Sequence, residues 1–157
     1  MGQKRQVGQH GVGRCGTGGF GPHPLAPAAL CRLLPAGFPF VDAAAFIMTY
    51  ATSHQALLDR GQLKSGETVL VLGAAGGVGT AAIQIAKAAG AKVIAAASTD
   101  EKCALCQSIG ADATINYTKE NLRDAIKAAT EGKGPDVIYD PVGGDFAEPA
   151  FRSLAWL

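Results

Sequence analysis

The sequence has no excess of charge of either sign. Its 157 residues include 14 basic and 13 acidic ones, which leaves a net charge of +1. Without a long basic stripe, there is no electrostatic reason to expect a nucleic-acid partner. No apolar run reaches the roughly 18 residues that a membrane-spanning helix needs, so no membrane partner is expected. Hydrophobic residues make up 48% of the chain, which excludes disorder throughout and predicts a globular domain.

Cysteine is also scarce. Four irregularly spaced cysteines are too few for a secreted domain held by disulfides, so we expect reduced thiols inside a cell. Cys103 and Cys106 form a C-x-x-C pair, which is either a redox pair or two buried structural residues. The structural interpretation is favoured, because a reactive thiolate belongs in the first turn of a helix and Cys103 lies beyond it.

Residues 1–41 contain no acidic residue and no apolar stretch of the kind found in signal peptides. We therefore expect a cytoplasmic protein, with a mitochondrial location as the alternative. Residues 1–30 are rich in glycine and proline without a period, and are predicted to be irregular or disordered. Gly11, Gly13 and Gly16 fit the letters G-x-G-x-x-G, but no strand pattern precedes them and no helix pattern follows, so the match is interpreted as accidental.

Regular patterns begin at Asp42, which is expected to cap a helix over 43–60 that Gly61 ends. Four β-rich segments then alternate with helical ones. The predicted strands are 68–72, 92–97, 113–116 and 136–140. The predicted helices are 80–89, one capped by Ser98 and running to 109, one capped by Thr118 and running to 130, and 146–157. This alternation predicts an α/β fold: a Rossmann-like parallel sheet, incomplete with about four strands, helices on both faces, and an irregular N-terminal segment. We expect residues 31–157 to form this partial dinucleotide-binding domain.

The turn after the first of these strands carries the strongest functional signal. Gly73, Gly76 and Gly79 recur every three residues between a buried strand and an alanine-rich helix. Glycine lets a pyrophosphate approach the backbone, and the helix supplies unpaired N–H groups and the positive end of its dipole. We therefore predict a dinucleotide contact at Gly76, Gly77, Val78 and Gly79. The alternative is a turn that only packs helix against strand.

With these motifs the sequence resembles the medium-chain dehydrogenase/reductase superfamily, in its zinc-independent quinone oxidoreductase branch. The matching strings are ALLDRGQLKSGETVLVLGAAGGVGTAAIQIAKAAGAKVIAAAS, SIGADATINY and GPDVIYDPVGG. The resemblance runs from Arg32 to Trp156 and places Ala74 where the common fingerprint has its first glycine. It implies a domain that binds NADPH and an enzyme that transfers hydride from the nicotinamide to an electrophilic quinone or enone.

The end of the second strand favours NADP over NAD. An NAD site usually has an acidic residue about twenty residues past the glycine turn, and Ala97 occupies that place. Ser98 can donate a hydrogen bond to a 2′-phosphate, and the resemblance places a phosphate-binding lysine at Lys102 and a tyrosine beside the same phosphate at Tyr117. The alternatives are that Ser98 only caps its helix and that Lys102 is an ordinary surface charge.

For the nicotinamide end, the resemblance aligns Thr52 with a threonine near the ring, although such a threonine also occurs as a packing residue. The turn after the fourth strand places Val142 and Gly143 at the carboxyl ends of the strands, where cofactors bind. Asp140 is expected to order that turn. No residue is predicted to act as a catalytic acid or base, and no clustered Cys and His spacing predicts a metal site.

The resembled family has a catalytic domain before this region and two further strands after it. We therefore expect a truncated form whose fourth strand lies at the sheet edge, where pairing and homo-oligomer formation are favoured. Two hypotheses follow. The chain represents an NADPH-dependent quinone or enone reductase by its cofactor domain, or it is a non-catalytic dinucleotide-binding fragment without a substrate domain.

Overall fold

The computed structural model describes residues 6–19, 21 and 23–156. The chain divides into two compact units, residues 1–47 and residues 48–157. Helix α1 (Phe40–His54) begins in the first unit and ends in the second. No helix among the described residues combines the length and the apolar character that crossing a membrane requires.

The first unit contains a small antiparallel sheet. Strand β1 (Gly11–Gly13) pairs with β2 (Cys31–Leu33), and the 3-10 turn η1 (Ala28–Leu30) leads into β2. The described part of residues 1–30 is therefore largely irregular, as expected, but it also contributes one short strand. Gly11 and Gly13 lie in β1, and within the described residues no helix follows them directly, as expected for an accidental match to the glycine motif.

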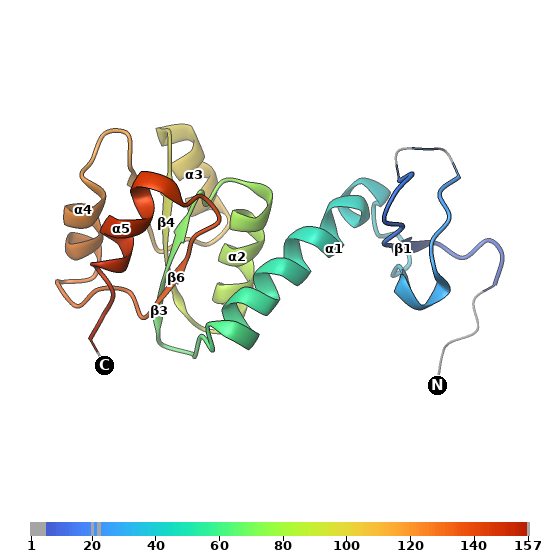
Figure 1. Ribbon diagram of the computed structural model, residues 1–157, viewed down its shortest axis with the longest axis horizontal. Helices are drawn as coiled ribbons and strands as arrows, with labels where there is room; N and C mark the ends of the chain where they lie inside the picture. Colours follow the sequence, from blue (N-terminus) through green and yellow to red (C-terminus); the bar gives the residue numbers. More distant parts are fainter. Residues whose placement is uncertain (1–5, 20, 22, 157) are drawn as a thin grey trace. The chain divides into compact units, whose positions relative to one another are not determined.

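The second unit is a four-stranded parallel sheet with the strand order β5-β4-β3-β6. Figure 1 labels β3, β4 and β6 of this sheet. Its strands are β3 (Thr68–Leu72), β4 (Lys92–Ala97), β5 (Ala113–Asn116) and β6 (Val137–Tyr139). The first three have the predicted bounds, and β6 is one residue shorter at each end than expected. The chain therefore crosses from β3 to β4 and β5, then returns to the other side of β3, which is the predicted Rossmann-like arrangement.

Helices cover both faces of this sheet, which explains why its strands are apolar without alternation. On one face, Val69 and Val71 of β3 pack in a core with residues of the π-helical turn η2 (Gln55–Arg60), α2 (Gly77–Ala88) and α3 (Asp100–Ser108). On the other face, Leu70 and Leu72 pack with residues of α4 (Leu122–Ala129) and α5 (Ala147–Phe151). Every residue from Val69 to Leu72 is at most 1% exposed.

The bounds of α1, α2 and α5 differ from the sequence prediction. α1 begins at Phe40, and Asp42 lies in its first turn instead of capping it, because the N–H of Ala43 already bonds to the carbonyl of Pro39. α2 begins at Gly77, three residues earlier than expected. At the C-terminus, the 3-10 turn η3 (Gly144–Phe146) precedes α5, which ends at Phe151 and not at 157, a residue outside the described ones.

Two predicted caps are wrong by one and three residues. α3 is capped by Thr99, whose hydroxyl accepts the N–H of Lys102, and not by Ser98. α4 is capped by Asn121, whose side chain accepts the N–H of Asp124, and not by Thr118. The turns after β4 and β5 each contain several residues with short polar side chains, and any of these residues can cap a helix.

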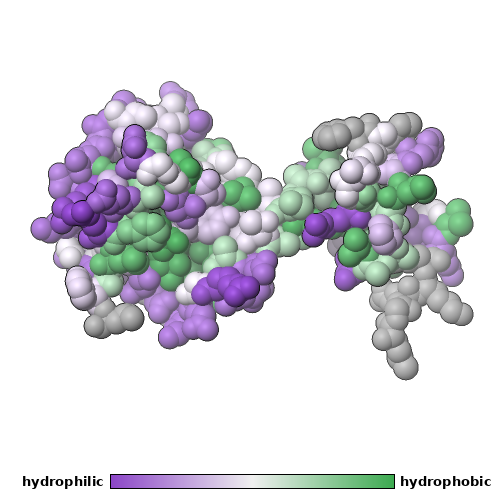
Figure 2. Space-filling view, in the orientation of Figure 1, coloured by the Kyte–Doolittle hydropathy of each residue, from purple (hydrophilic) through white to green (hydrophobic). Residues whose placement is uncertain are grey.

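β6 is an edge strand within the described part of the sheet, as the Rossmann order predicts. Its residues Val137 and Ile138 are half-buried. Figure 2 shows an apolar area on this face of the second unit, over the region where Figure 1 draws α5 and β6, bordered by hydrophilic residues. An apolar edge of this kind favours pairing with another strand.

Candidate functional site

The carboxyl ends of the four parallel strands meet at one edge of the sheet, and each strand leads there into a turn. The register aligns Leu72 with Ala96 and Ala97 with Asn116, so the neighbouring strands end at the same level. Ligands of open parallel sheets bind at this edge. The turns after β3, β4, β5 and β6, together with the first turns of α2 and α3, contain nine of the ten residues predicted to contact a cofactor, and Thr52 lies on α1.

The glycines after β3 serve two different purposes. Gly76, at the N-cap of α2, and Gly77 are exposed, whereas Gly79 is buried. A Cβ on Gly79 would lie 2.5 Å from the carbonyl oxygen of Gly73, so this glycine lets α2 pack closely against the turn. The first helical bond runs from the N–H of Thr80 to the carbonyl of Gly76, so the N–H groups of Gly77, Val78 and Gly79 have no partner inside the helix.

The turn after β6 is ordered by Asp140, as predicted. Its Oδ1 accepts the N–H groups of Val142 over 2.9 Å and of Gly143 over 2.8 Å. Gly143 has a φ of +68°, a conformation that favours glycine. This turn touches the glycine turn, since a Cβ on Gly73 would lie 2.7 Å from Cγ2 of Val142. The structure therefore brings the predicted pyrophosphate and nicotinamide residues side by side.

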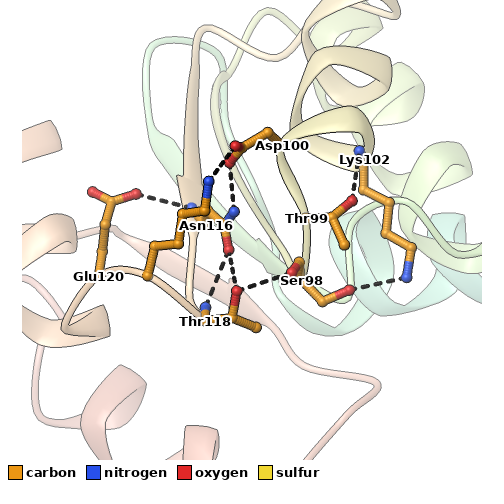
Figure 3. A network of polar contacts seen from close by, with 8 residues as sticks. Ser98, Thr99, Asp100, Lys102, Asn116, Thr118 and Glu120 are labelled. Atoms are coloured by element: carbon orange, nitrogen blue, oxygen red, sulfur yellow. Dashed lines mark hydrogen bonds and ion pairs between the residues drawn. The ribbon is translucent and has the colours of Figure 1, made fainter.

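Ser98 and Lys102 are held together at the turn after β4. The ammonium group of Lys102 donates to the Ser98 hydroxyl over 2.9 Å (Figure 3). Ser98 is half-buried and Lys102 is exposed, and Ala97 before them carries no charge. A hydroxyl and a cation thus stand together at the rim of the sheet, where an NAD site has a carboxylate.

A polar network joins this turn to the one after β5 (Figure 3). Asn116, 6% exposed, donates to Asp100 over 2.6 Å and accepts the N–H of Thr118 over 3.2 Å. The Thr118 hydroxyl lies within hydrogen-bonding distance of the Ser98 carbonyl and of the Asn116 side chain. The network fixes the position of Ser98 relative to β5.

Hydrogen bonds lower the pKa of two acidic residues of this rim, Asp100 and Glu101. Asp100 forms an ion pair with Lys119. The hydrogen bond within this ion pair, together with the one from Asn116, lowers the pKa of Asp100. The same contact raises the pKa of Lys119. A hydrogen bond from the Thr99 hydroxyl lowers the pKa of Glu101. The charge of Asp100 is thereby balanced by a neighbouring cation.

Tyr117 follows β5 directly, and its N–H bonds to the carbonyl of Ala97 over 3.1 Å. Its half-buried ring lies 4.5 Å, centroid to centroid, from the ring of Phe146 after β6. The two rings belong to the core under α4 and α5, so packing fixes the position of Tyr117.

Thr52 lies on α1 with an exposed side chain. The neighbouring residues make the contacts to α2. A Cβ on Gly77 would lie 3.1 Å from Cγ2 of Thr49, and the Ser53 hydroxyl donates to the carbonyl of Val78 over 2.8 Å. The sequence prediction named neither of the two, because a serine or threonine inside a helix carries no signal of what it touches.

The C-x-x-C pair is structural. Cys103 and Cys106 are 8% and 0% exposed, and burial raises the pKa of both thiols. A raised pKa disfavours the reactive thiolate. Among the described residues, no group of three or more His, Cys, Asp or Glu side chains is arranged to hold a metal ion.

Comparison with known proteins agrees with this geometry. The family described as zinc-binding dehydrogenase matches residues 77–156, about half of the chain. The chain belongs to this family. Its relatives place it in the quinone oxidoreductase-like branch of the medium-chain dehydrogenase/reductase superfamily, and its second unit has the fold of the nicotinamide dinucleotide-binding domain.

Three similar proteins illustrate the match. The quinone oxidoreductase-like protein 2 homolog of Nematostella vectensis is 40% identical over 151 residues, which are 95% of this chain and 41% of the relative. A probable oxidoreductase from Mycobacterium abscessus superimposes with a TM-score of 0.77 at 43% identity, covering 83% of this chain and 41% of that one. The Escherichia coli quinone oxidoreductase complexed with NADPH gives a TM-score of 0.75 at 39% identity, covering 81% and 39%. The chain thus spans about two-fifths of the length of these proteins.

Proposed function

We propose that the carboxyl edge of the sheet binds NADPH and that the chain supplies the cofactor domain of a quinone or enone reductase. The observation that carries the proposal is the exposed pair Gly76 and Gly77 at the start of α2, in the glycine turn whose Gly73 lies against Val142 of the turn that Asp140 orders. An E. coli relative with the same fold is described as a complex with NADPH, which supports the same ligand here.

The glycine turn fits a pyrophosphate. A Cβ on Gly76 would lie 3.3 Å from the carbonyl of Gly73, and one on Gly77 would lie 3.1 Å from Thr49. Side chains at these two positions would therefore fill the space beside the backbone that a pyrophosphate would occupy. The N–H groups of Gly77 and Val78 would bind phosphate oxygens at the positive end of the helix dipole. The buried Gly79 would act indirectly, by allowing the close packing of α2.

The rim after β4 fits the 2′-phosphate that distinguishes NADPH from NADH. The hydroxyl of Ser98 and the ammonium of Lys102 would bind this group, and Ala97 brings no carboxylate to repel it. The ion pair of Asp100 with Lys119 would reduce the repulsion between Asp100 and this phosphate. We propose that Tyr117 lies beside the same phosphate.

At the other end, Val142 and Gly143 would contact the nicotinamide riboside, and Thr52 would face the ring. The cofactor would supply the hydride, and the protein would orient it toward a quinone or enone acceptor. In this proposal Val142, Gly143 and Thr52 position the cofactor, and none of them is assigned the role of a catalytic acid or base.

The second candidate function is a dinucleotide-binding protein without catalytic activity. It is favoured because all ten predicted site residues are assigned to the cofactor and none to an acceptor. Calorimetry with NADPH, followed by an assay of NADPH oxidation with a simple quinone, separates the two. Binding with turnover supports the reductase, binding without turnover supports the second function, and a folded chain that gives no heat contradicts both.

A further inference from the structure

Ser53 is a buried hydroxyl that the sequence did not single out and that lies between the two turns of the candidate site. It is 0% exposed and sits near the end of α1. It bonds to Val78, the second residue of α2, and to the hydroxyl of Tyr139, the last residue of β6. One side chain of α1 therefore joins α2, which follows the glycine turn, to β6, which precedes the turn that Asp140 orders.

The direction of the two hydrogen bonds follows from counting protons. The carbonyl of Val78 can only accept, so the single hydroxyl proton of Ser53 is donated to it over 2.8 Å. The Ser53 oxygen then accepts the Tyr139 hydroxyl proton over 3.1 Å. Tyr139 is 8% exposed, so both hydroxyl groups find their hydrogen-bond partners within the protein. Two consecutive hydrogen bonds thus connect Tyr139 through Ser53 to Val78.

Val78 and Tyr139, the two residues that these hydrogen bonds connect, both adjoin residues predicted to contact the cofactor. Val78 lies in the first turn of α2, between Gly77 and Gly79. Tyr139 immediately precedes Asp140, which fixes the N–H groups of Val142 and Gly143. Movement of Tyr139 relative to Val78 would change the distance between the pyrophosphate and nicotinamide turns.

We propose that Ser53 is a positioning residue that sets this distance through Tyr139 and Val78. It would not touch the cofactor. Its effect would be on ligands that occupy both turns, and not on ligands that occupy only the rim formed by Ser98 and Lys102. The proposal rests on the proposed NADPH site.

The test compares two ligands on the full chain. NADPH would span the rim and both turns, whereas adenosine 2′-monophosphate would reach only the rim. In Ser53→Ala we expect NADPH to bind about tenfold more weakly, as for the loss of one buried hydrogen bond, and adenosine 2′-monophosphate to bind as before. The fluorescence of bound NADPH should also move toward that of free NADPH, because the nicotinamide would be less fixed.

Tyr139→Phe is the second variant, because it keeps the buried ring and removes only the hydroxyl. It should reproduce the selective loss of NADPH affinity even if Ser53→Ala folds poorly, and thermal unfolding checks the fold of each variant. The matched control is Ser108→Ala, which removes a hydroxyl that bonds only within α3.

Equal affinity of wild type and both variants for NADPH, or an equal loss for both ligands, would overturn the role of Ser53. A wild-type chain that binds neither ligand would instead refute the NADPH site itself, and the role of Ser53 with it.

Discussion

The ammonium nitrogen of Lys102 lies 2.9 Å from the hydroxyl oxygen of Ser98, to which it donates a hydrogen bond. The network of Asn116 and Thr118 holds the backbone of Ser98 from the other side. A surface lysine is usually free to rotate, but this contact keeps the cation at the rim, beside the place where a carboxylate would select NAD.

Replacement of Lys102 by alanine should separate the two dinucleotides. Lys102→Ala removes a charge-assisted contact to the 2′-phosphate, so NADPH should bind about tenfold more weakly or worse, with NADH almost unchanged. Calorimetry with both ligands measures this. Lys133→Ala is the matched control, because it removes an equal charge from the exposed loop before β6. Equal losses for NADPH and NADH would mean that Lys102 does not recognise the phosphate.

Two glycine variants should separate folding from binding. In Gly79→Ala the new Cβ would lie 2.5 Å from the Gly73 carbonyl and 2.6 Å from that of Ala74, so we expect a loss of about 1–3 kcal/mol in unfolding free energy. In Gly76→Ala the nearest atom is 3.3 Å away, so the fold should persist while dinucleotide affinity falls. Thermal unfolding and calorimetry give the two quantities. Stable Gly79→Ala protein would contradict the packing role of that residue.

Asp112 should contribute stability that depends on pH. Burial opposes its charge, but the hydrogen bonds from Lys87 and the N–H of Val93 prevail and lower its pKa. A lowered pKa stabilises the fold above the ordinary pKa of the carboxyl group, and this contribution disappears as the pH falls through the lower folded value.

Asp112→Asn should therefore cost roughly 0.5–1 kcal/mol at pH 7, a small value because water screens this partly exposed pair. The difference from wild type should shrink as the pH falls below about 4. Urea unfolding at pH 7 and pH 3 measures it. A difference that grows in acid would refute the assignment.

The cysteines should fall into two reactivity classes. Cys103 and Cys106 are buried with raised pKa values, whereas Cys15 and Cys31 are partly exposed. A maleimide at neutral pH should modify Cys15 and Cys31 first, and the other two only after denaturant is added. Peptide mass analysis after timed labelling identifies the sites. Rapid labelling of Cys106 in folded protein would contradict its burial.

The sequence predicted the sheet better than the helix ends. β3, β4 and β5 have the expected bounds, because each is an apolar run enclosed by polar residues or glycine. The caps at Ser98 and Thr118 were wrong, because the adjacent Thr99 and the nearby Asn121 have equal chemical ability and tertiary contacts decide between them.

The candidate site was predictable where glycine or a missing acid marked it. Gly76 is exposed and Lys102 contacts Ser98, and the binding role of these residues stays a prediction. Ser53 could not be found in this way, because its importance lies in contacts with Val78 and Tyr139 that are 25 and 86 positions away.

The binding of NADPH at the carboxyl edge is tested most directly by titrating it into isotope-labelled protein and following the backbone amide signals. We expect the largest shifts at Gly76, Gly77, Val142 and Gly143, with little change at Gly66 and Gly134 near the amino ends of the strands. Absence of shifts in folded protein, or shifts centred on Gly66 and Gly134, would contradict it.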